Sequence, residues 1–158
     1  DWIAAQARAD MALDGLMRFP EGSTVAARGA PEPPAELVSL FFPTPDIDYQ
    51  GCRIALADGE QLRIDLTPPP CRFWSVVLTT PWLESVEQRV TPASINSERC
   101  EPNPDGSVTV IVSERDPGVA NWIPLRGYYR AQIAYRVLLA ETPPREAQFT
   151  VGAVEQQG

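Results

Sequence analysis

Carboxylates are the side chains of this chain that could carry out hydrolysis. Four acidic residues fall on predicted strand ends or loops: Glu98, Glu101, Glu114 and Asp116. Two carboxyl groups roughly 5–10 Å apart can cleave a glycosidic bond, one as acid and the other as base or nucleophile. Glu98 and Asp116 are our candidate pair for a carboxylate-dependent, glycosidase-like hydrolase. However, the chain has 21 acidic residues, so some of them will lie close together by chance.

The segment 115–122 brings together residue types that could bind a ligand. Asp116, Asn121 and Trp122 could line a pocket, with the indole of Trp122 stacking on the bound molecule. The structural alternative is that Asp116 holds a turn, Asn121 satisfies backbone groups and Trp122 closes one end of the fold. We favour this alternative, because Asp-Pro-Gly is common turn chemistry.

Arg72 and Trp74 are two further ligand-binding candidates. The guanidinium of Arg72 could face an anionic ligand, or could pair with Asp65 or Glu98 across a sheet. Trp74 follows Phe73 in an apolar run and is typical of a core residue. A different hypothesis is a carrier of a small hydrophobic ligand, with an interior cavity lined by Trp74, Tyr135 and Trp122.

Histidine and lysine are absent, and all 13 basic residues are arginine. Without imidazole the chain cannot build a Ser-His-Asp or Cys-His pair, nor a histidine-based metal site. Without lysine it has neither a Schiff base nor a phosphate-loop lysine. No calcium-loop pattern occurs either, so we expect no cofactor and no metal. Such a composition is typical of codon bias in a GC-rich bacterium, and the exclusions favour a role other than catalysis.

The chain length and the net charge limit the remaining classes of function. A chain of 158 residues fits one domain that needs no metal or disulfide to fold. Its formal net charge of −8 argues against nucleic acid or an anionic membrane as the main partner. No apolar run approaches the roughly 20 residues that a membrane-spanning helix needs. We therefore expect no transmembrane segment.

Three cysteines, Cys52, Cys71 and Cys100, are too few and too widely spaced for a zinc site. Cys71 begins an apolar strand and is typical of a small buried hydrophobic residue. Cys52 and Cys100 fall in predicted strands and could pair if those strands are neighbours in an oxidising compartment.

The chain divides into three parts by pattern. Residues 1–48 are predicted to be an amphipathic helix over 1–19, ended by Pro20, and a proline-rich connector. Residues 49–142 are predicted to be a β domain, and residues 143–158 a tail of declining apolar content. The sequence begins without methionine or a signal pattern, so we expect an excerpt from a longer or processed chain. The sequence does not identify the cellular compartment of the protein, and we slightly favour the cytoplasm over the periplasm or secretion.

Alternating apolar residues predict the β domain. The clearest strands are expected at 49–57, 61–67, 72–80, 107–113 and 128–139. Asp58-Gly59 indicates a hairpin between the first two. Six or seven antiparallel strands with frequent turns predict a mainly β fold, an antiparallel β-sandwich or jelly roll, preceded by the N-terminal helix.

Four motifs in order resemble a known family. They are Pro69-Pro70-Cys71-Arg72-Phe73-Trp74-Ser75-Val76, Pro104-Asp105-Gly106-Ser107, Arg115-Asp116-Pro117-Gly118-Val119 and Asn121-Trp122-Ile123. Together they are similar to domain-of-unknown-function family 1214, over about Phe42 to Pro144. Ile123 stands where the family usually has leucine. The resemblance implies a jelly-roll-like β-sandwich, often the C-terminal part of a longer protein, and no established reaction.

Our leading hypothesis is a non-catalytic β-sandwich module that contributes a binding surface or structural half to a larger protein or assembly. The expected partners are a missing N-terminal domain or partner subunit, and a small-molecule ligand is a further option. The hydrolase and the hydrophobic carrier are the alternatives.

Overall fold

The computed structural model describes residues 46–86 and 92–154, which form eight β-strands and no helix. The predicted helix over 1–19 lies outside the described residues, as does most of the proline-rich connector. The strands are β1 (Ile47–Ala55), β2 (Glu60–Leu66), β3 (Phe73–Thr79), β4 (Ser94–Asn96), β5 (Val108–Ser113), β6 (Trp122–Pro124), β7 (Arg130–Leu138) and β8 (Gln148–Ala153).

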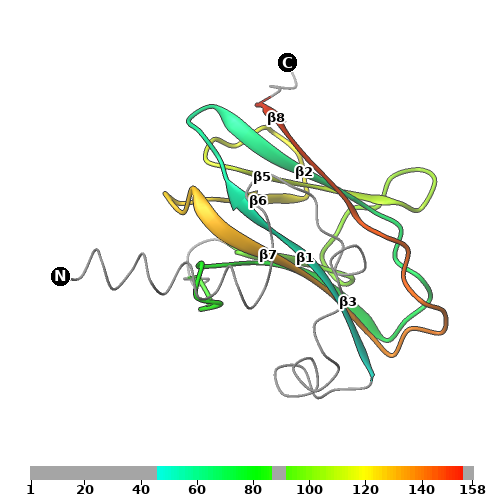
Figure 1. Ribbon diagram of the computed structural model, residues 1–158. Coiled ribbons are helices and arrows are strands. Elements are labelled where there is room, and N and C mark those ends of the chain that lie inside the picture. Colours follow the sequence, from blue (N-terminus) through cyan, green and yellow to red (C-terminus); the bar gives the residue numbers. More distant parts are fainter. Residues whose placement is uncertain (1–45, 87–91, 155–158) are drawn as a thin grey trace.

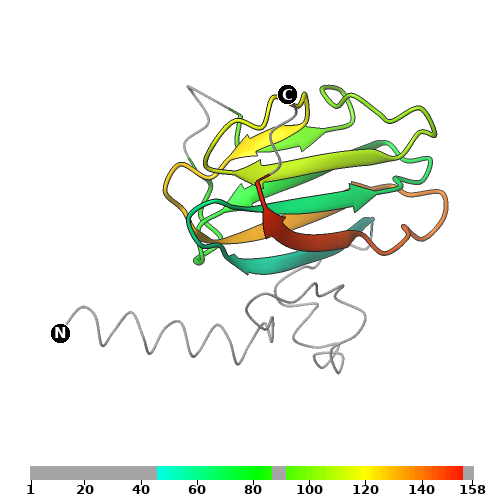
Figure 2. The ribbon, with the colours of Figure 1, turned by 90° about the horizontal axis from the view of Figure 1, so that it is seen from above.

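The described strands form two four-stranded sheets. Sheet A has the order β1-β7-β3-β4, and sheet B has the order β6-β5-β2-β8. Figure 1 shows β1, β7 and β3 in one layer and β2, β5, β6 and β8 in the other, and Figure 2 gives the perpendicular view. The predicted mainly β fold is confirmed. One pairing departs from the antiparallel prediction, because β6 runs parallel to β5.

The alternation of apolar and polar residues along a strand determines which side chains enter the core, as predicted for β2. Leu62, Ile64 and Leu66 are buried, whereas Arg63 between them is exposed. Successive side chains of a strand point to opposite faces, so one face of each strand can be wholly apolar. The buried side chains of both sheets form a single hydrophobic cluster that includes Val76, Val110, Val112, Ile123 and Ile133.

The predicted hairpin at Asp58-Gly59 is wrong. The turn is present, with Gly59 at a left-handed φ of 81°, but β1 lies in sheet A and β2 in sheet B. The turn therefore carries the chain from one sheet to the other. Local turn chemistry specifies a reversal of direction, whereas the choice of strand partner depends on residues far away in the sequence.

The segment interpreted as a C-terminal tail also differs from the expectation. Residues Gln148–Ala153 form β8, an edge strand that pairs antiparallel with β2. Phe149, Val151 and Ala153 alternate with Gln148, Thr150 and Gly152, but only Phe149 of this short strand is buried. Backbone hydrogen bonds to β2, rather than burial, hold it in the sheet.

The condition for a Cys52–Cys100 disulfide is not met. Cys52 lies in β1 and Cys100 follows β4, at opposite edges of sheet A, with β7 and β3 between them. All three cysteines are free thiols. Cys52 is buried, and its burial raises the thiol pKa to about 12.

Within the described ranges no helix is both long enough and apolar enough to cross a bilayer.

Candidate functional site

Trp74 and Tyr135 belong to the core. Trp74 is in β3 and Tyr135 in β7, and their rings meet edge to face with centroids 6.3 Å apart. Both are buried. The Tyr135 hydroxyl is itself buried and has no hydrogen-bond partner among the described residues, and this burial raises the Tyr135 pKa. Trp74 therefore does not present a surface for a ligand.

Asn121 holds backbone segments together. Its Oδ1 accepts from the Glu101 backbone N–H at 2.8 Å, and its Nδ2 donates to the carbonyls of Glu101 at 2.8 Å and Thr109 at 3.1 Å. These three bonds bind the loop before β5 to the strand itself. The side chain is buried and engaged at both ends, so it does not face a ligand.

Trp122 lies on the outer face of sheet B. It pairs with Ile111, whose side chain points away from the core cluster, whereas Ile123 beside it points inward. Its indole Nε1 donates to the hydroxyl of Ser113 at 3.0 Å. Trp122 is half-buried over this strand and lies on the opposite side of sheet B from Trp74 and Tyr135.

Asp116 and Arg72 are both exposed. Asp116 Oδ1 accepts from the Gly118 backbone N–H at 2.8 Å, which is the turn role weighed above. Asp65 forms its ion pair with Arg63, at 2.7 Å. The five residues proposed as a ligand site thus fall on two sheets, in the core, on outer faces and in turns.

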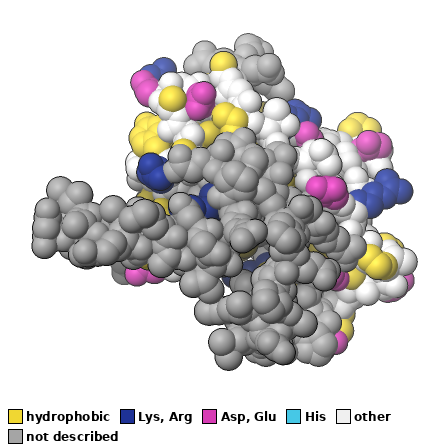
Figure 3. All heavy atoms as spheres, viewed as in Figure 1, with side chains coloured by type: hydrophobic (Ala, Val, Ile, Leu, Met, Phe, Trp, Pro, Cys, Tyr) yellow, Lys and Arg dark blue, Asp and Glu magenta, His cyan; other side chains and the backbone are white. Residues whose placement is uncertain are grey.

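The carboxylates of the hydrolase hypothesis are separated by β5. Glu98 and Glu101 precede this strand, and Asn121 fixes the Glu101 backbone near its start. Glu114 and Asp116 follow it, and a six-residue strand spans about 17 Å. Glu114 also accepts from the Gly127 N–H at 2.8 Å. Acidic side chains on the face in Figure 3 are scattered, and the described residues hold no group of three or more potential metal ligands.

The carrier hypothesis needs an interior cavity. The pocket found among the described residues is small, with a volume of about 10 Å³, roughly the space of one water molecule. Its lining consists of Arg53, Arg130 and Pro81 together with the core residues Ile54 and Ala131. Trp74 and Tyr135 meet in the core, whereas Trp122 lies on the other side of sheet B, so the three aromatic residues do not line one cavity.

Arg53 and Arg130 of this pocket lie on a surface that we call the arginine face, the side of sheet A that points away from the core. Its positions follow from the strand register: Ile47, Tyr49, Gly51, Arg53 and Ala55 of β1; Arg130, Gln132, Ala134, Arg136 and Leu138 of β7; Phe73, Ser75, Val77 and Thr79 of β3; and Ser94 and Asn96 of β4. Three of these positions are arginine and none is Asp or Glu. In a chain of net charge −8, this is a local excess of positive charge.

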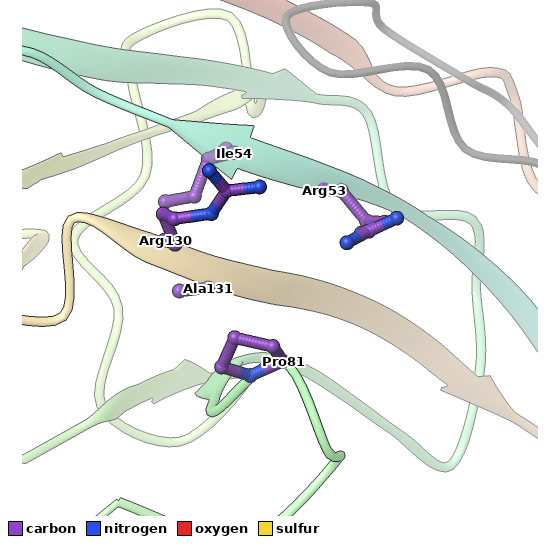
Figure 4. Close-up of a pocket in the computed structure, with 5 residues that line it drawn as sticks. All are labelled: Arg53, Ile54, Pro81, Arg130 and Ala131. Atoms are coloured by element: carbon purple, nitrogen blue, oxygen red, sulfur yellow. The ribbon is translucent and has the colours of Figure 1, made fainter. Parts of the chain in front are cut away.

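Two guanidinium groups flank the pocket. Figure 4 shows Arg53 projecting from β1 and Arg130 from the neighbouring β7, with Pro81 beside them. Arg136 lies further along β7, with its guanidinium 5.9 Å from the centroid of the Tyr49 ring. Guanidinium groups bind carboxylates and phosphates through paired hydrogen bonds, so this arrangement suits an anionic group.

Much of the arginine face is buried, although it lies outside the core. Arg53 and Ser75 are each 8% exposed and Gln132 is 3% exposed. The loop after β3 covers one corner, where Gln132 Nε2 donates to the Pro81 carbonyl at 2.6 Å. Between the arginines, Gly51, Ala134 and Val77 align across three strands as a row of small apolar residues.

Sequence reasoning selected Arg72 as the anion-facing arginine and missed Arg53, Arg130 and Arg136. The available signal was alternation, because these residues occupy the polar positions of two predicted strands. Their clustering depends on the pairing of β1 with β7, which are about 80 residues apart in the chain.

Comparison with known protein families shows which family this sequence matches. The family described as "Protein of unknown function (DUF1214)" matches residues 41–142. The chain belongs to this family. The resemblance inferred from the four motifs is thereby confirmed, and the DUF1214 match extends through the strands from β1 to β7.

Solved structures similar to this DUF1214 chain come from longer proteins. A crystal structure of an uncharacterized protein from Burkholderia cenocepacia is 33% identical, with a TM-score of 0.71, and the match covers 77% of this chain and 34% of that one. The VPA0106 protein from Vibrio parahaemolyticus is 16% identical, with a TM-score of 0.55, and covers 94% and 43%. This chain therefore spans about a third of the Burkholderia cenocepacia chain and less than half of the Vibrio parahaemolyticus chain. No curated protein matches it.

Proposed function

We propose that this domain is a non-catalytic β-sandwich module of a longer protein, and that its arginine face docks a polypeptide segment bearing carboxylates. The observation that carries the proposal is the composition of the face. Arg53, Arg130 and Arg136 lie there, and none of the strand positions that make up the face is Asp or Glu, although the chain as a whole carries a net charge of −8.

Charge complementarity favours an acidic partner over a nucleic acid. The chain repels polyanions through its net charge of −8, and a polyanion would meet that charge over most of the surface. A short segment with a few carboxylates can contact the arginine face alone. The row Gly51, Ala134 and Val77 provides room and apolar contact for the side chains between those carboxylates.

The arginine face supports a catalytic function less well than a docking function. A pocket with space for about one water molecule cannot enclose a small-molecule substrate, since such sites measure roughly 300–1,000 Å³. Docking needs only a broad, complementary face. The match to about a third of the Burkholderia cenocepacia chain also supports a module that works with other parts of a protein.

Photo-crosslinking from the centre of the arginine face tests the proposal. Benzoylphenylalanine would replace Ala134 in the full chain, with the same group in place of Thr150, on the outer face of sheet B, as the control. We expect position 134 to crosslink a peptide containing Asp or Glu. The yield should fall at about 0.5 M NaCl, because salt screens exposed charges.

Charge reversal is the second test of the proposed docking face. Arg130→Glu with Arg136→Glu should lower the crosslinking yield, whereas Arg99→Glu with Arg115→Glu, two exposed arginines outside the face, should leave it unchanged. The proposal fails if position 134 crosslinks nothing beyond sheet A, or if salt and the reversal at 130 and 136 do not alter the yield.

A further inference from the structure

We propose that β8 pairs antiparallel with the β8 strand of a second copy of this chain, so that the two B sheets join into one continuous sheet across a two-fold axis. β8 is the outermost strand of sheet B (Figure 2), whereas the arginine face is on sheet A. This pairing therefore goes beyond the proposed function and stands or fails independently of it.

Backbone hydrogen bonds of sheet B fix which residues of β8 bond to β2. The Val154 N–H donates to the Gly59 carbonyl at 2.9 Å. This pair continues the register in which Gln61 lies opposite Gly152. Hydrogen-bonded pairs of an antiparallel ladder recur at every second residue. The residues of β8 that direct their N–H and carbonyl groups toward β2 are therefore the even-numbered ones, from Gln148 to Gly152.

The odd-numbered residues of β8 direct their backbone groups to the free edge. Phe149, Val151 and Ala153 each present one N–H and one carbonyl there, and β2 is the only strand in the described part of the chain that pairs with β8. A second β8 with the two-fold axis at Val151 places Val151 opposite its own copy and Phe149 opposite Ala153. Every outward N–H then meets a carbonyl. The edge is thus complementary to itself, as a two-fold contact requires.

The side chain at the axis also favours the pairing. Val151 lies opposite Leu62 of β2, so it points to the core side of sheet B, yet it is 39% exposed. In the dimer the two Val151 side chains face each other across a hydrogen-bonded pair and cover each other. Such cross-strand pairs of β-branched residues stabilise a sheet.

The other edges of the described sheets carry features that oppose strand pairing. β4 and β6 have three residues each, and β6 ends in Pro124. β1 carries the charged residues Asp48 and Arg53. β8 has six residues, with neither proline nor a charged side chain. Short length, charge and proline are the devices that normally protect edge strands, so β8 is the edge best suited to a strand partner.

Sedimentation of the full chain tests the pairing. Between about 10 µM and about 1 mM protein, the average mass should rise from 17.4 kDa toward twice that value. Added salt should strengthen the association, because it screens the repulsion between two chains of net charge −8. Val151→Lys places like charges opposite each other at the axis and should weaken the association by about tenfold. Gln148→Lys, the matched control, adds the same charge away from the axis and should change it little.

Amide hydrogen exchange identifies the edge that is used. As the protein concentration rises, exchange of the Phe149, Val151 and Ala153 N–H groups should slow, whereas exchange of the Thr150 and Gly152 N–H groups, already bonded to β2, should change little. Val151→Pro removes one outward N–H and no bond to β2. It should weaken the dimer, and thermal unfolding of the dilute variant should show that it remains folded.

Two results overturn the proposal. One is a mass that stays at 17.4 kDa up to about 1 mM protein, because a self-complementary edge should associate at that concentration. The other is a dimer in which neither changes at Val151 nor the exchange of the outward N–H groups respond to association, since such a dimer uses another surface. Neither result bears on the arginine face.

Discussion

The side-chain amide of Gln50 is hydrogen-bonded to the backbone of Arg145 and Ala147. Gln50 Oε1 accepts from the Ala147 N–H at 2.7 Å, and Gln50 Nε2 donates to the Arg145 carbonyl at 3.0 Å. Gln50 is in β1, an edge of sheet A, and Ala147 immediately precedes β8, an edge of sheet B. One amide thus joins the two sheets on the side where β1 and β8 are the edge strands of the described part of the chain.

Gln50→Ala should loosen β8. The change leaves a backbone donor and an acceptor without partners, at a cost of about 1–3 kcal/mol of folding free energy. Hydrogen exchange should rise in β8 more than in β5. Gln148→Ala, at an exposed glutamine of β8, is the control. Equal exchange in both variants would contradict a role for Gln50 in holding this strand.

Gly51→Ala should destabilise the domain, because a methyl group at this position would overlap the backbone carbonyl oxygen of Ile133. The neighbouring strand must shift, and we expect a loss of about 1–3 kcal/mol in urea unfolding. Gly152→Ala is the matched control in β8, where a Cβ would meet nothing within 4 Å. It should be neutral or slightly stabilising. Similar losses in both variants would show that strand glycines matter here for another reason than space.

Asn121→Ala should lower stability by about 1–3 kcal/mol, since three partly buried hydrogen bonds to Glu101 and Thr109 are lost. Asn121→Asp keeps the acceptor but loses both donors, so we expect it to lower the stability as well. Asp116→Ala, in an exposed turn, should change stability by less than about 1 kcal/mol. Thermal unfolding of the three variants checks this. A ligand-binding role for Asn121 would be favoured instead if Asn121→Ala unfolded like the unmodified chain.

Tyr135→Phe should leave stability unchanged or raise it. The Tyr135 hydroxyl is buried without a partner among the described residues, so its removal relieves a desolvation cost of about 1–3 kcal/mol. Tyr128→Phe, at an exposed tyrosine, should have no effect. A marked loss of stability in Tyr135→Phe would mean that the hydroxyl is satisfied, for instance by a buried water molecule.

The Cys52 thiol should resist both labelling and ionisation. At pH 8 a disulfide reagent should modify the partly exposed Cys71 and Cys100 and spare Cys52 until the chain unfolds. Burial raises the Cys52 pKa from 9.0 to about 12. Between those values the folded chain binds the extra proton, so stability falls with rising pH, by roughly 1.4 kcal/mol per pH unit for one thiol.

Cys52→Ala provides the control for this alkaline loss. Tyr135 contributes in the same direction, because its pKa is also raised by burial. The double variant Cys52→Ala with Tyr135→Phe should therefore show a much flatter stability profile above pH 9. An unchanged profile would place the alkaline loss elsewhere in the chain.

The candidate site could be predicted from sequence only in its parts. Arg53, Arg130 and Arg136 occupy the polar positions of alternating strands, which is a local property of the sequence. Their meeting on one face depends on which strands pair, and pairing is decided by contacts across the whole chain. Loop residues such as Asp116 attracted attention because loops often carry function, yet Asp116 holds a turn.

The sequence by itself determined the mainly β fold, the buried faces of strands such as β2, the turn at Gly59 and the family. Each of these is encoded within a few neighbouring residues, through the two-residue strand period or a left-handed turn position. Tertiary structure alone decided that β1 and β2 belong to different sheets, that β8 is a strand and that Cys52 and Cys100 lie at opposite edges of sheet A. Those features depend on partners distant in sequence, whose contacts exist only once both sheets have formed.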